Sequence, residues 1–148
     1  MERLYWNNDW KFAETWEEAM KEAVYPENEM EDVRLPHTCK ELPYHYFDEH
    51  AYQMLCGYRR HFMAPEAWRG KSVELTFEGV AHDAVVYVNG TEVKAHHCGY
   101  TGIFCGTCKI PEIWGGQCTC GACRQPGKFE YSAVRICHRL HDFWRDVS

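Results

Sequence analysis

The sequence lacks several features that would indicate a membrane protein or a nucleic-acid-binding protein. None of its apolar runs reaches the ~18 residues that a transmembrane helix needs. The opening MERLYWNNDWKF also lacks the apolar core of a signal peptide. Positive charge is not in excess, because the net charge of the 148 residues is −6, and a nucleic-acid partner needs a basic face. These absences favour a cytoplasmic protein with no membrane and no nucleic-acid partner.

Cysteine is scarce in the first two thirds of the chain and abundant in the last third. Residues 1–101 contain three cysteines, and residues 102–148 contain six. The charge changes at the same place, from 10 basic and 18 acidic residues to 6 basic and 4 acidic residues. Disulfides are unusual in the reducing cytosol, so nine cysteines need another explanation. The two compositions indicate two segments of different origin.

The first segment carries the signals of an antiparallel β-structure. In KSVELTFEGV, Val73, Leu75 and Phe77 alternate with polar residues, and this period of two predicts a half-buried strand. Asn89-Gly90 lies between two further strand-like runs and predicts a β-hairpin, because both turn residues need a positive φ. We expect residues 58–97 to form an antiparallel β-meander within an all-β sandwich.

The remaining stretches give weaker signals. Residues 15–24, TWEEAMKEAV, predict a short helical or turn-like segment with Thr15 as its N-cap. EDVRLPH predicts a short extended run that reaches Pro36. Residues 40–53 have no clear period and predict a surface loop. Beyond Tyr100 no alternation of useful length is found, so we expect an irregular C-terminal segment.

Several motifs occur in an order typical of one enzyme family. They are DWKF at residues 9–12, VRLPH at 33–37, GYRR at 57–60, LTFEGVAHDAVVYVNGTEV at 75–93 and CGYT at 98–101. Over residues 4–101 the chain resembles the start of a glycoside hydrolase of family 2, the group of β-galactosidases and β-glucuronidases. The resemblance implies that residues 1–101 are the N-terminal part of a sugar-binding jelly-roll β-sandwich, which is incomplete here.

The resemblance also implies where catalysis takes place. In the family a later (β/α)8 barrel supplies two glutamates, which a retaining glycosidase holds about 5–5.5 Å apart. Such a barrel does not fit after residue 101, so we expect this chain to have no catalytic residue, no cofactor and no activity of its own. Carbohydrate would be the partner of the intact parent enzyme.

The break in the family pattern after Thr101 suggests a shifted reading frame. If one base is removed from the Gly102 codon, a permitted choice of synonymous codons reads NVLAVHVDN, NIPPFG and FGGMYR at the spacing that the family would have. We therefore interpret residues 102–148 as an out-of-frame, cysteine-rich tail.

Two other functions stay open. The fragment could act as a stand-alone carbohydrate-binding module. Alternatively, Cys105-x2-Cys108 and Cys120-x2-Cys123 have the spacing of paired zinc ligands, and four thiolates would make a closed tetrahedral site. Eleven residues separate these pairs, which is short, and Cys118 and Cys137 would be spare.

For a few other candidate site residues a structural role is favoured over a functional one. His37 is expected at a strand end. His96 and His97 are adjacent on a strand and would point to opposite faces, which argues against a metal pair. Asp83 is expected to be a solvated acid. Core and inter-domain packing is favoured over sugar stacking for three tryptophans, namely Trp6, Trp10 and Trp16.

Overall fold

The chain folds as two antiparallel β-sheets that pack face to face. The computed structural model describes residues 3–22, 24–40, 45, 54–62, 65–68, 72–80, 83–98, 101–108, 117–123 and 133–141. Residues 68, 72–73, 106–108, 117–123 and 133–141 are described by their backbone alone. Within these ranges the regular elements are strands and two short 3-10 helices, η1 (Glu18–Lys21) and η3 (Glu66–Trp68). The all-β sandwich expected from the sequence is thereby confirmed, whereas its jelly-roll winding remains a prediction.

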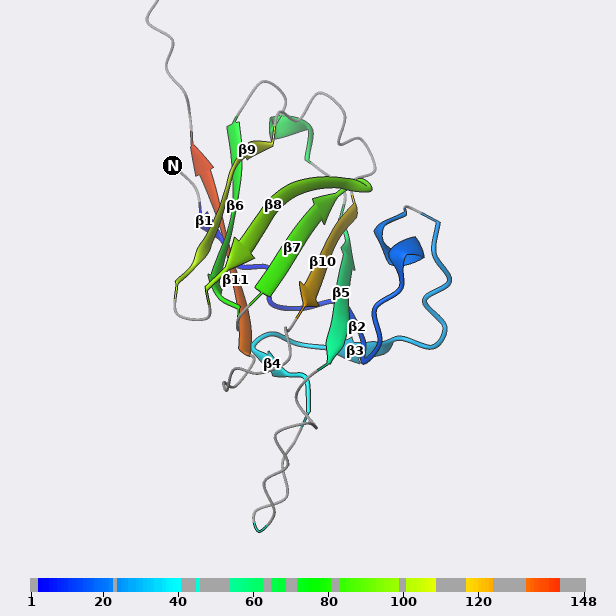
Figure 1. Cartoon of the computed structure of the whole chain (residues 1–148). Helices are drawn as coiled ribbons and strands as arrows, with labels where there is room; N and C mark the ends of the chain where they lie inside the picture. The colour runs from blue at the N-terminus through cyan, green and yellow to red at the C-terminus, as the bar shows by residue number, and fades with distance from the viewer. Residues whose placement is uncertain are drawn as a thin grey trace, which may run out of the picture.

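The larger sheet has six strands in the order β3-β2-β5-β10-β7-β8 (Figure 1). Their bounds are Glu31–Val33, Trp10–Ala13, Leu55–His61, Gln117–Cys123, Asp83–Val88 and Thr91–His97. The smaller sheet has the order β1-β11-β6-β9, and β4 also pairs with β11. Its strands are Arg3–Leu4, Ala133–His141, Ser72–Gly79, Ile103–Cys108 and, for β4, His37–Thr38.

A single apolar core lies between the two sheets. From the larger sheet, Trp10, Tyr58 and Val86 are fully buried, and Phe77 of the smaller sheet is also fully buried. Because alternate residues of a strand face opposite sides, these side chains define the inner face of each sheet. Leu75 and Phe77 thus occupy the core positions that the period of two predicted.

The predicted meander over residues 58–97 is wrong. β6 does not pair with β5 or β7, because it lies in the smaller sheet between β9 and β11. In the larger sheet β10 lies between β5 and β7 and pairs with both. Alternation along a strand shows which residues are buried but not which sheet the strand joins, so it does not identify the pairing partners of β6.

The predicted hairpin is confirmed. β7 and β8 pair antiparallel around a turn in which Asn89 has a φ of 51° and Gly90 a φ of 78°.

The helical segment predicted at residues 15–24 is also present, but it begins later than expected. The residue before η1 is Glu17 rather than Thr15, and Glu17 makes no side-chain capping bond. Most of the predicted loop at residues 40–53 lies outside the described residues.

The expectation of an irregular C-terminal segment is wrong as well. Residues beyond 101 supply β9, β10 and β11, and two of these strands lie inside a sheet rather than at its edge (Figure 1). Strand pairing uses the N–H and C=O groups that every residue except proline carries. A local signal was also available, because in β11 Val134, Ile136 and Leu140 alternate along the sequence with Arg135, Cys137 and Arg139.

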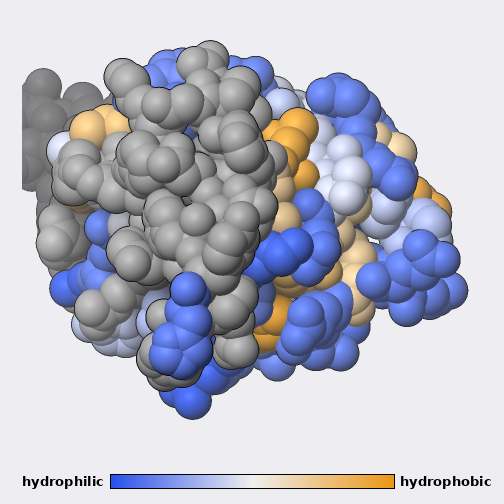
Figure 2. Space-filling model, turned by 60° about the horizontal axis from the view of Figure 1, so that its bottom comes forward, coloured by the Kyte–Doolittle hydropathy of each residue, from blue (hydrophilic) through white to orange (hydrophobic). Residues whose placement is uncertain are grey.

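The described surface is mainly polar. On the face in Figure 2 hydrophilic side chains cover much of the described surface, and apolar surface shows in patches between them. The exposed large apolar residues are scattered along the described chain, and they are Tyr5, Val24, Leu55 and Phe104. No helix in the described ranges is long and apolar enough to cross a membrane.

Candidate functional site

The most elaborate side-chain cluster lies on the outer face of the larger sheet, under the segment between β2 and β3. We call this segment, residues 14–22 and 24–30, the cover segment. The backbone N–H of Trp16 donates a hydrogen bond to the backbone carbonyl of Leu55 over 2.8 Å. A Cβ atom added at Gly57 would lie 2.9 Å from Met20 Sδ and 3.0 Å from Trp16 Cε3. The missing side chain of Gly57 therefore lets the cover segment lie directly on β5.

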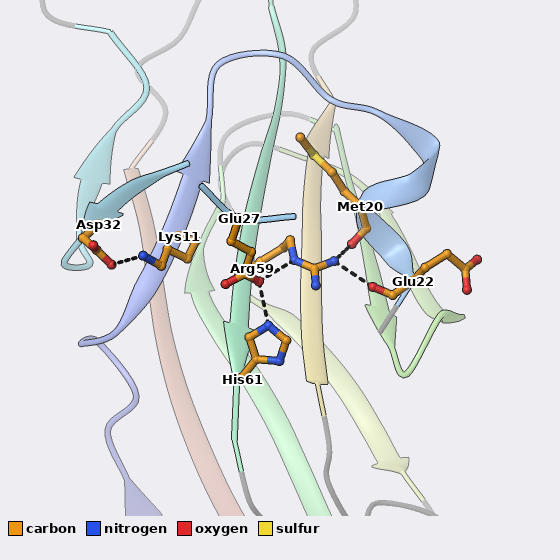
Figure 3. Close-up of polar contacts among 7 residues, drawn as sticks. All are labelled: Lys11, Met20, Glu22, Glu27, Asp32, Arg59 and His61. Atoms are coloured by element: carbon orange, nitrogen blue, oxygen red, sulfur yellow. Dashed lines mark hydrogen bonds and ion pairs between the residues drawn. The ribbon is translucent and has the colours of Figure 1, made fainter. Parts of the chain in front are cut away.

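Arg59 is the centre of this cluster (Figure 3). Its side chain is fully buried, and Nε donates to Glu27 Oε1 over 2.9 Å. Nη1 donates to the carbonyl of Glu22 over 3.0 Å and also to the carbonyl of Met20. The ring of Tyr25 lies 5.3 Å from the guanidinium carbon, within cation–π range. One buried cation thus contacts four residues of the cover segment.

Glu27 is shared between two donors of β5. Its Oε1 also lies 2.6 Å from Nε2 of His61, which follows Arg59 on the same face of the strand (Figure 3). Partial burial opposes ionisation of Glu27, but the hydrogen bonds from Arg59 and His61 outweigh it and hold the pKa of this carboxyl below its usual value.

Arg59 and Glu27 form a structural clamp, by which we mean that together they hold the cover segment on β5. The electrostatics of this pair do not suit acid–base catalysis. A general acid at neutral pH needs a raised carboxyl pKa, whereas that of Glu27 is lowered. Nε and Nη1 of Arg59 donate to Glu27 and to main-chain carbonyls, so they fix the path of the cover segment, whereas the buried Nη2 has no hydrogen-bond partner among the described residues. The geometry supports positioning of this segment on the sheet.

The three tryptophans have different surroundings. Trp10 is fully buried in the core, as its packing role predicted. Trp6 packs against Phe62, with ring centroids 4.6 Å apart. Trp16 stacks on Tyr87 of β7, with centroids 5.8 Å apart and an interplanar angle of 16°. Each ring is therefore engaged by neighbours within this chain.

The histidines and Asp83 are placed as follows. His37 is the first residue of the short strand β4 and comes directly after Pro36. Its Nδ1 lies 3.0 Å from the Tyr58 hydroxyl. Asp83 is not the solvated acid that was expected, because its Oδ1 pairs with His97 Nδ1 at 2.7 Å and its side chain is 19% exposed. The antiparallel register sets Asp83 opposite His97 across β7 and β8, which brings the two side chains together.

The four cysteines of the zinc alternative lie on two strands of different sheets. Cys105 and Cys108 belong to β9 in the smaller sheet, and Cys120 and Cys123 belong to β10 in the larger one. Cys105 is buried in the core, whereas the side chains of the other three lie outside the described part. Among the described residues no group of three or more His, Cys, Asp or Glu side chains could hold a metal ion.

The clamp at Arg59 was not found from the sequence. Arg59 was noticed as part of GYRR, but a charged residue in a strand is normally assigned to the solvent face. The available signal was Gly57 two residues before it, since a glycine within a strand marks a close approach of another segment.

Comparisons with known proteins agree with this architecture. No protein-family profile matches the chain. Among curated proteins, the β-galactosidase of Thermoanaerobacter pseudethanolicus is 43% identical over 99 residues, which are 66% of this chain and 13% of that enzyme. The β-glucuronidase of Formosa agariphila is 28% identical over 102 residues, 10% of its length. The chain thus spans a small fraction of the curated relatives that it matches.

Solved structures share the fold. A glycosyl hydrolase family 2 member from Bacteroides cellulosilyticus superposes with a TM-score of 0.80 at 16% identity, over 96% of this chain and 21% of that one. Bacteroides uniformis β-glucuronidase 2 gives a TM-score of 0.76 at 20% identity, over 94% of this chain and 18% of that one.

The fold and its neighbours define a β-sandwich domain of the kind present in family 2 glycoside hydrolases. In sequence, the chain is similar to a small part of enzymes named β-galactosidase and β-glucuronidase.

Proposed function

We propose that this chain is the N-terminal sugar-binding domain of a retaining β-glycosidase and does not catalyse the reaction by itself. The observation that carries this proposal is the 43% identity to a β-galactosidase over 99 residues. The parent enzyme would hydrolyse a terminal β-linked galactoside or glucuronide in carbohydrate metabolism. Its two catalytic glutamates would lie in a barrel outside this chain.

The sandwich would serve the parent enzyme by providing a rigid support. Arg59 and Glu27 fix the cover segment on β5, so its polar side chains are presented on one face of the larger sheet. The carbohydrate would be bound by the assembled enzyme rather than by this chain alone. We further propose a cytoplasmic location for the parent enzyme, where the four described cysteines would stay free thiols.

We also propose that residues 102–148 are read out of frame. The curated matches support this, because they extend over about 100 residues, 64–66% of the chain. The change in cysteine content and charge after Thr101 supports it as well. The strands β9 to β11 would then be formed by a sequence that replaces the original one.

A chimera tests the proposed role. In the Thermoanaerobacter pseudethanolicus β-galactosidase, the 99 matched residues are replaced by those of this chain. We expect hydrolysis of an aryl β-galactoside within about tenfold of the parent rate, because a domain with the same core should seat on the barrel in the same way. A soluble, folded chimera without activity would contradict the proposal.

The control is the same chimera with Phe77→Asp. Phe77 is fully buried between the two sheets, and an unpaired charge there should unfold the sandwich. If the control is as active as the unaltered chimera, the sandwich is not needed, and activity of the chimera no longer supports the proposed role.

A further inference from the structure

Two cysteines of the first segment lie in contact between the sheets. The Sγ atoms of Cys39 and Cys56 are 3.4 Å apart. Cys39 follows β4, which pairs with β11 of the smaller sheet, and Cys56 lies in β5 of the larger sheet. Cys56 is buried, whereas Cys39 is half-buried and is therefore the thiol that a dissolved reagent meets first.

A chain of hydrogen bonds leads away from this pair. Cys39 Sγ lies 3.3 Å from the hydroxyl of Tyr58, and that hydroxyl lies 3.0 Å from Nδ1 of His37. Burial lowers the pKa of His37, so at neutral pH its ring is neutral and one ring nitrogen is an acceptor. Tyr58 can then donate to His37 and accept the thiol proton of Cys39.

We propose that Cys39 and Cys56 are an oxidisable pair that forms an intrachain disulfide in the presence of a small disulfide such as glutathione disulfide. The thiolate of Cys39 attacks one sulfur of the oxidant, and a glutathione thiolate leaves. The thiolate of Cys56 then attacks Cys39 Sγ in the mixed disulfide and releases the second glutathione. The pair loses two electrons and two protons, and the oxidant is reduced to two thiols.

The disulfide would connect the two sheets at the point where β4 meets β5. It would close a loop of the chain from residue 39 to residue 56, and closing a loop restricts the unfolded state more than the folded one. The oxidised chain should therefore be the more stable form. In a reducing cytosol the pair stays as thiols, and oxidation would couple the stability of the domain to the redox state of its surroundings.

The sequence allows the disulfide to be detected without ambiguity. Trypsin cleaves after Arg34, Lys40 and Arg59, which gives peptides 35–40 and 41–59 with one cysteine each, Cys39 and Cys56. The full chain is incubated with glutathione disulfide, alkylated, digested without reductant and analysed by mass spectrometry. We expect the linked pair 35–40/41–59 to exceed any other product containing Cys39 by about tenfold, because Cys56 Sγ lies 3.4 Å from Cys39 Sγ in the folded chain.

Two controls decide whether the fold causes the pairing. Cys56→Ser should abolish the linked pair, whereas Cys98→Ser should leave its yield unchanged. In 8 M urea the excess over other products should disappear. The proposal is overturned if Cys39 links mainly to peptide 95–109, if it stays reduced while other cysteines react, or if the same excess persists in urea.

Discussion

Arg59 Nε lies 2.9 Å from Glu27 Oε1, and this contact joins the middle of β5 to the cover segment 32 residues earlier in the chain. Arg59 is fully buried and Glu27 is 19% exposed. A buried charge is tolerated only when its partners are in place, so the two residues depend on each other.

Removal of the carboxylate should therefore destabilise the fold. We expect Glu27→Ala to lower the free energy of unfolding by about 3 kcal/mol, since the guanidinium of Arg59 would be left buried without its counter-ion. Urea unfolding followed by tryptophan fluorescence measures the change. Glu18→Ala is the matched control, because the ion pair of Glu18 with Lys21 is exposed and its loss should change stability little. Equal effects of the two variants would refute the clamp.

The same pair should make stability depend on pH. The pKa of Glu27 is lower in the folded chain than its ordinary value of 4.5, so the unfolded chain binds more protons in that range. The stabilisation is present above about pH 4.5 and is lost as the pH falls through the folded pKa. Unfolding measured from pH 7 to pH 3 should show a smaller acid-induced loss for Glu27→Gln than for the unaltered chain. Identical pH profiles would show that Glu27 is not held as proposed.

The hairpin turn should be sensitive to a single methyl group. Gly90 has a φ of 78°, and an added Cβ would meet its nearest neighbour, the Lys21 carbonyl oxygen, at an ordinary 3.5 Å. The cost of Gly90→Ala is therefore backbone strain, about 1 kcal/mol. Thr91→Ala, next to it at an exposed strand position, should change the free energy of unfolding by less than about 0.5 kcal/mol. A Gly90→Ala variant as stable as the original would show that residue 90 does not adopt this positive φ.

The purified chain should not turn over a glycoside. A retaining mechanism needs two carboxylates about 5–5.5 Å apart, and the resemblance assigns both to a barrel that does not fit in residues 102–148. We expect no release of nitrophenol from nitrophenyl β-galactoside or β-glucuronide above the buffer blank. Turnover that disappears when a carboxylate of this chain is replaced would show that the assignment is wrong.

The local features of the fold could be predicted from the sequence, and the long-range ones could not. Asn89-Gly90 identified the hairpin and Leu75 the buried face of β6, because turn chemistry and strand period are properties of neighbouring residues. The position of β6 in the other sheet depends on contacts between distant segments. The strand β11 could have been predicted, because Val134, Ile136 and Leu140 alternate with Arg135, Cys137 and Arg139. Its pairing with β1 and β6 depends on contacts between distant segments.

The contact between Arg59 and Glu27 could not be predicted from the sequence, for the same reason. Gly57 could have indicated a close approach of another segment to β5, but nothing in the local pattern identifies Glu27 as the partner of Arg59. The two residues meet only after the cover segment folds back on the sheet. The contact between Cys39 and Cys56 likewise depends on how β4 and β5 come together.

The most direct test is the nucleotide sequence around the Gly102 codon and downstream of the Ser148 codon. We predict that a shift of one base after Thr101 opens a frame that continues through the rest of the sandwich into a (β/α)8 barrel with two catalytic glutamates. A sequence in which no such frame follows would contradict the proposal that this chain is the N-terminal part of a β-glycosidase read out of frame after residue 101.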